Sequence, residues 1–172
     1  VAAGRLVNVV AVLEGDTLPE TWNAPAEKSH ILKGFEHWAD PPRRLLEAVT
    51  EWRQWRLYQA AAEAPPLPGN VIRIGDAAGP VLPFLAQGGV LALEDAAALA
   101  AALASVGEPR TAFDAIRAGR LARRAEIAKA SRDNGRIYHL DGLAAKARDL
   151  VLRASSPDRL LRRFDWLYGF EA

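Results

Sequence analysis

The residues best suited to chemistry lie between positions 74 and 96. Asp76 follows Gly75 and the short apolar stretch Val71–Ile74, which predicts a β-strand that ends in a carboxylate. In open α/β sheets ligands bind at this carboxyl edge. A carboxylate there accepts hydrogen bonds, so it suits the hydroxyl groups of a sugar or a polyol.

Further along the chain, Gly88 and Gly89 open an expected helix. Because glycine has no side chain, the backbone there can approach a flat ligand closely. The first N–H groups of a helix lack partners within it, and its positive dipole end favours negative charge. With Asp76, the pattern indicates a site for a polyol chain at one end and a ring that gains negative charge at the other. A flavin has both parts.

The segment 74–89, with Leu91–Ala96 after it, closely resembles the flavin-binding signature of FAD-dependent aromatic-ring hydroxylases related to p-hydroxybenzoate hydroxylase. The resemblance implies that Asp76 takes the place of the ribityl-binding aspartate and that Pro83 lines the flavin ring. It also implies a backbone cradle for the pyrimidine edge. Gln87 could reach the flavin or the substrate, and a loop-stabilising amide is equally compatible. The expected cofactor-binding set is Gly75, Asp76, Pro83, Gln87, Gly88, Gly89 and Val90.

Three further segments, 6–12, 134–140 and 164–169, resemble parts of salicylate-hydroxylase-like members of that superfamily. The resemblance implies a parent enzyme that uses FAD, NAD(P)H and O2 to hydroxylate a small phenolic or benzoate-type ring. Hydroxybenzoate, hydroxynicotinate and polyketide substrates all remain open, as does the choice of NADH or NADPH. No catalytic residue can be named from the sequence, and we expect no metal site.

Two departures from the family pattern bear on cofactor binding. Gly79 stands where the family usually has histidine, and the Gly-x-Gly-x-x-Gly turn that binds the FAD pyrophosphate is absent. We therefore expect a missing N-terminal dinucleotide-binding half as a partner, and weak or no FAD binding by the isolated chain. The start at Val1 and the lack of methionine indicate a fragment or a processed chain. The alternative function is an FAD-free remnant that acts only as a structural or interaction module.

The expected fold class is α/β, the C-terminal portion of an FAD/NAD(P)-binding-fold hydroxylase. It comprises one strand-loop-helix flavin unit, a mainly helical tail and strands of a substrate-domain sheet. Strands are predicted at 5–13, around 52–58 and at 71–74, and a turn at 64–70. Pro41-Pro42 should stop the first helix, and Asn134-Gly135 should cap the fourth. Helices are predicted over 26–38, 43–49, 90–104, 110–133, 143–153 and 157–168.

These elements predict three regions. Residues 1–60 would be the end of a substrate-binding sheet domain, 61–105 a returning segment of the FAD-binding domain, and 106–172 a C-terminal helical region. A homodimer is left open.

Composition excludes several classes of function. The chain has no cysteine and a formal net charge of +1, so disulfides, thiolate metal sites and a global attraction to nucleic acid are not expected. The arginines of the 110–133 helix are interspersed with acids, which favours a solvated helix face over a nucleic-acid surface. No apolar run reaches the length of a membrane span, and the 90–104 helix is expected to be too short for one, so a cytoplasmic protein is expected.

Overall fold

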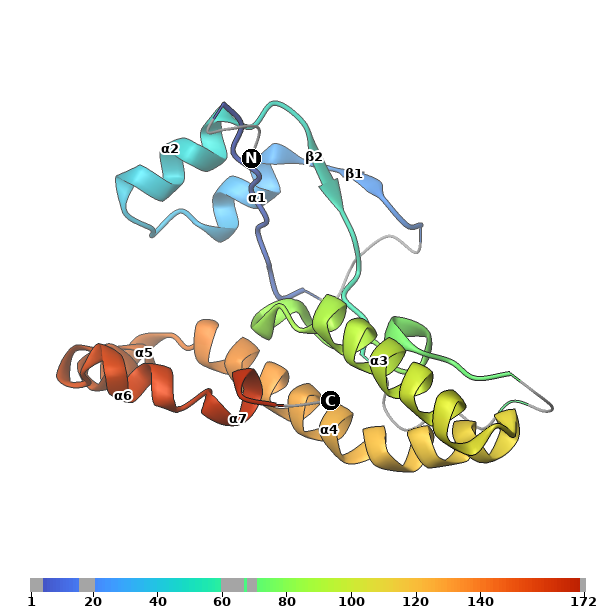
Figure 1. Cartoon of the computed structure of the whole chain (residues 1–172). Helices are drawn as coiled ribbons and strands as arrows, with labels where there is room; N and C mark the ends of the chain where they lie inside the picture. Colours follow the sequence, from blue (N-terminus) through green and yellow to red (C-terminus); the bar gives the residue numbers. More distant parts are fainter. Residues whose placement is uncertain (1–4, 16–20, 60–66, 68–70, 171–172) are drawn as a thin grey trace. The chain divides into compact units, whose positions relative to one another are not determined.

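The structure is a computed structural model that describes residues 5–15, 21–59, 67 and 71–170. The chain divides into two compact units, Val1–Leu57 and Tyr58–Ala172. The described residues are mostly helical, with a single two-stranded sheet (Figure 1). The predicted turn at 64–70 lies, except for Leu67, outside the described residues.

The first unit contains a small sheet and two helices. Strand β1 (Ala24–Ala26) pairs antiparallel with β2 (Trp52–Gln54), which accounts for the first residues of the strand predicted around 52–58. Helices α1 (Lys28–Gly34) and α2 (Asp40–Ala48) complete the unit. The core of the unit comprises Ile31, Phe35 and Leu46.

The two prolines at 41 and 42 lie inside the first turn of α2, not in a break before it. Proline is well suited to this place because the first N–H groups of a helix have no partner within it and its fixed φ is helical. The prediction that the second helix starts at Arg43 was therefore wrong by one turn.

The strand predicted at 5–13 is not formed among the described residues. The segment is nevertheless patterned as a strand would be, because alternate residues Val9, Ala11 and Leu13 pack against the core of the first unit. Gly34 permits this packing, since a Cβ atom there would lie 2.4 Å from Leu13 Cδ2. A ladder also needs a neighbouring strand, however, and none pairs with this segment among the described residues.

The second unit is built on two long helices joined at Gly107. Helix α3 (Gly88–Val106) ends at that glycine, which has φ 72° and so forms a left-handed C-cap. Helix α4 (Pro109–Tyr138) runs back along α3 (Figure 1). Shorter elements complete the unit: the 3-10 turns η2 (Gly75–Ala77) and η3 (Pro83–Leu85), and the helices α5 (Gly142–Ala154), α6 (Pro157–Arg162) and α7 (Asp165–Tyr168).

Three predictions about this unit need correction. Residues 71–74 form no strand ladder, for the same reason as 5–13, and the predicted 157–168 helix is two short helices. Gly135 does not cap α4, which continues through it. A Cβ atom on Gly135 would lie 2.6 Å from Phe84 Cε2, so this glycine makes room for a ring rather than ending a helix.

Helix α3 is longer than predicted. With 19 residues and an apolar composition, it meets the length and composition of a membrane span, contrary to the expectation that it is too short. Those two properties alone are weak evidence for a span. Its acidic pair, Glu94 and Asp95, is ion-paired with arginines of α4, so this face of α3 packs against protein.

Candidate functional site

Asp76 and the start of α3 lie close together. A Cβ atom built on Gly88 would lie 3.7 Å from Asp76 Oδ1, and one on Gly89 would meet nothing within 4 Å. Asp76 is exposed, and among the described residues its side chain makes no hydrogen bond. The arrangement combines a free carboxylate, a helix N-terminus with unpaired N–H groups, and backbone open to a ligand.

The turn that carries Asp76 requires glycine at position 75. Gly75 has φ +57°, a left-handed conformation that residues with side chains rarely adopt. A Cβ atom at this position would lie 3.1 Å from Ala92 Cβ, which is also tight. The Gly75 N–H donates a 2.8 Å hydrogen bond to Asp95 Oδ2 of α3. Gly75 therefore fixes the turn against α3 immediately before Asp76.

Helix α4 holds the same turn from the other side. Arg124 donates from Nη1 to the carbonyl oxygens of Gly75 (3.1 Å) and Gly79 (3.2 Å), and from Nη2 to Asp95. The Arg124 guanidinium thus links both ends of the turn to Asp95, which itself accepts the N–H of Gly75. The contacts bracket Asp76 without involving its side chain.

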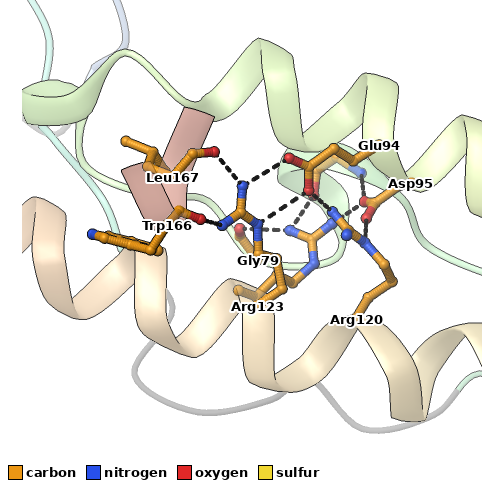
Figure 2. A network of polar contacts seen from close by, with 9 residues as sticks. Gly79, Glu94, Asp95, Arg120, Arg123, Trp166 and Leu167 are labelled. Atoms are coloured by element: carbon orange, nitrogen blue, oxygen red, sulfur yellow. Dashed lines mark hydrogen bonds and ion pairs between the residues drawn. The ribbon is translucent and has the colours of Figure 1, made fainter. Parts of the chain in front are cut away.

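The rest of the ionic cluster extends to the C-terminal helix (Figure 2). Arg120 donates to Asp95 Oδ1 (3.0 Å) and to Glu94. Arg123 donates to Glu94 Oε1 (3.0 Å), and its other N–H groups reach the carbonyl oxygens of Trp166 (3.1 Å) and Leu167 (2.9 Å). Arg120 and Arg123 are buried, so the expectation of a solvated arginine face was wrong for this part of α4.

The ionic cluster shifts the pKa values of Glu94 and Arg120 in the directions that favour their charged forms. Burial by itself would raise the pKa of Glu94, but hydrogen bonds and charges from Arg123 and Arg120 outweigh it, and the pKa is lowered. Burial would likewise lower the pKa of Arg120, yet Glu94 and Asp95 raise it. Both shifts favour the charged forms of Glu94 and Arg120.

Helix α4 also holds the segment around η3, at residues 82–84. Ser131 Oγ donates to the Leu82 carbonyl (2.6 Å), and Asn134 Nδ2 donates to that of Phe84 (3.3 Å). The Phe84 ring lies over Gly135 and forms edge contacts with Tyr138 and His139. His139 is therefore a packing partner of the Phe84 ring.

The remaining candidates lie along the same loop. Pro83 is exposed and begins η3, while Val90 is exposed in the first turn of α3. Gln87 is buried, and its amide donates to the Leu85 carbonyl at 3.3 Å, which favours a loop-stabilising role over contact with a ligand. All seven candidates thus lie between η2 and the first turn of α3.

Comparison with known proteins gives a consistent result. Over 173 residues, 98% of this chain, the sequence is 32% identical to 3-hydroxybenzoate 6-hydroxylase of Klebsiella oxytoca. It is 34% identical over 171 residues to 3-amino-4-hydroxybenzoate 2-monooxygenase of Streptomyces cremeus. It is 31% identical over 182 residues to salicylate hydroxylase of Pseudomonas putida. The chain is homologous to part of the aromatic-ring hydroxylases. No protein-family model matches it.

The similarity covers only a portion of each relative. This hydroxylase-related chain spans 43%, 42% and 40% of the length of those three proteins. The resemblance inferred from the sequence is therefore confirmed, and the chain corresponds to a partial region of such proteins.

Proposed function

We propose that the chain is the C-terminal part of an FAD-dependent monooxygenase that hydroxylates a phenolic or benzoate-type ring with NAD(P)H and O2. The observation that carries the proposal is the approach of the Asp76 carboxylate to Gly88 in a chain homologous to aromatic-ring hydroxylases. The three relatives named above are a hydroxybenzoate hydroxylase, an aminohydroxybenzoate monooxygenase and a salicylate hydroxylase, which supports a small aromatic substrate.

The described residues fit a flavin. Asp76 is a free acceptor for ribityl hydroxyls, and the first-turn N–H groups of Gly88, Gly89 and Val90 would favour negative charge on the pyrimidine edge. Open space at Gly89 lets a ring approach the backbone. Pro83 would help to keep water from the ring. When bound, the flavin supplies the redox chemistry of hydroxylation.

The domain organisation belongs to the same proposal. Residues 1–60 would complete a substrate-binding sheet domain, and 61–105 would return to the FAD-binding domain. Residues 106–172 would form a C-terminal helical region that supports the flavin loop. The division of the chain between Leu57 and Tyr58 supports the first boundary. The pyrophosphate-binding motif would lie in a preceding half, which we propose as the partner of this chain in a cytoplasmic enzyme.

The test is to purify the full-length product of the gene that encodes this chain and record its absorption spectrum. We expect a yellow protein with flavin bands that consumes NAD(P)H faster when a hydroxybenzoate or salicylate is added. A folded, colourless product that does not bind added FAD would contradict the proposal and favour the alternative of an FAD-free structural module.

A further inference from the structure

We propose that Arg124 and Asp95 are positioning residues that fix where the Asp76 carboxylate lies. This inference rests on the proposed function, since it concerns the flavin site of the same loop. Among the described residues, neither Arg124 nor Asp95 hydrogen-bonds to the Asp76 side chain, and both instead bind the backbone of the turn.

The Asp76 side chain makes no hydrogen bond among the described residues, so nothing in its own contacts fixes it beside Gly88. A free carboxylate that must meet a ligand is best held through its backbone, because its oxygens then remain available to the ligand. The position of Asp76 is therefore set by the turn on which it stands.

The turn is held by side chains of two helices. Asp95 accepts a hydrogen bond from the N–H of Gly75, and Arg124 donates to the carbonyls of Gly75 and Gly79. The contacts lie on both sides of Asp76, one from α3 and the others from α4. Since Gly75 is in a left-handed conformation, the turn is one that a free chain would adopt only part of the time, and the two charged residues select it.

Arg124 binds the carboxylate of Asp95 and two carbonyl oxygens at once, which uses the planar fork of a guanidinium. A lysine ammonium is a point charge on a flexible stem, and it could keep the ion pair but not all three contacts. The substitution Arg124→Lys therefore separates the positioning role from charge balance in the buried cluster.

Two measurements on the full-length gene product test the inference. The first is hydrogen exchange of the amides at 75–79 without flavin, which does not depend on the proposed function. Arg124→Lys should raise exchange there about tenfold, the effect of losing a hydrogen bond to a charged group. Arg117→Lys is the matched control, because Arg117 pairs with Asp114 on α4 and forms no hydrogen bond with residues 75–79 among those that the structure describes. Its loop exchange should equal that of the wild type.

The second measurement is the dissociation constant for FAD, by titration of the flavin-free protein. Arg124→Lys should raise it about tenfold. Asn134→Ala controls for general loosening of the loop, because it releases the Phe84 end and should leave exchange at 75–79 unchanged. If Arg124→Lys is too unstable to purify, Asp95→Asn probes the same turn from α3 with the same expected results.

The outcomes separate the two claims. Unchanged exchange at 75–79 in Arg124→Lys would refute the positioning role, and so would increased exchange with unchanged FAD affinity. If the wild-type protein binds no FAD while the exchange results are as expected, the proposed function fails, and with it the assignment of the turn to a cofactor. The contacts of Arg124 with the turn would still be supported.

Discussion

Two glycines of α4 are expected to respond differently to replacement by alanine. In a helix interior alanine is more favourable than glycine by about 0.8–1.0 kcal/mol. At Gly119 an added Cβ atom meets nothing within 4 Å, so Gly119→Ala should raise the free energy of unfolding by about that amount. At Gly135 the same atom would lie 2.6 Å from Phe84 Cε2 and 2.7 Å from Cδ2.

Overpacking of this kind costs about 1–3 kcal/mol. The helix gain offsets part of it, so Gly135→Ala should change stability by between about zero and a loss of 2 kcal/mol. The Phe84 ring cannot move away freely, because it contacts Tyr138 and His139 and its carbonyl accepts from Asn134. The two variants should therefore differ by about 1–3 kcal/mol although the substitution is the same.

Urea denaturation of the chain and the two single variants measures this difference. Adding Phe84→Ala to Gly135→Ala removes the ring, and in that background alanine at 135 should become favourable, as at 119. If Gly135→Ala stabilises the chain as much as Gly119→Ala, the close packing of Phe84 on α4 is wrong. The same conclusion would follow if Phe84→Ala left the effect of Gly135→Ala unchanged.

Further predictions concern the ionic cluster and the core beside it. Because the folded-state pKa of Glu94 is lowered, its contribution to stability is present above its unfolded pKa of about 4.3 and is lost as the pH falls through the folded value. Urea midpoints between pH 7 and 3 should show this loss, and Glu94→Gln should make the curve flatter. At pH 7, Glu94→Gln should lower the free energy of unfolding by about 3–5 kcal/mol, because Arg120 and Arg123 lose a buried partner. A loss below about 1 kcal/mol would mean that the cluster is solvated. Leu167→Ala should lower the free energy of unfolding by about 2–5 kcal/mol in the same assay, since Leu167 is only 3% exposed and packs with Leu91 and Ile127. A change near zero would mean that α7 does not pack on α3 and α4.

The helices and the loop residues could be predicted from the sequence, but the ionic cluster could not. Arginines recur along α4 among exposed acids, and a charged run of that kind is usually solvated. A signal was nevertheless present in α3, where Glu94 and Asp95 interrupt an otherwise apolar helix. An acidic pair in such a helix needs buried partners, and the neighbouring arginine-rich helix is where they lie.

The predicted strands failed for a different reason. Alternate residues Val9, Ala11 and Leu13 pack against the core, as the side chains of a half-buried strand would. Whether an extended segment becomes a strand depends on a neighbour that its own sequence does not contain. Gly135 lies inside α4 against the Phe84 ring, and local helix-capping rules cannot include this contact between residues far apart in the chain.

The central claim is that Asp76 and the start of α3 bind one flavin between them. The most direct test is the dissociation constant for FAD of the full-length gene product carrying Asp76→Ala, compared with Asp141→Ala, which removes an exposed carboxylate at the start of α5. Loss of a charged hydrogen-bond acceptor should weaken FAD binding about ten- to hundredfold in the first variant and leave it unchanged in the second. Equal affinities in the wild type and Asp76→Ala would contradict the account.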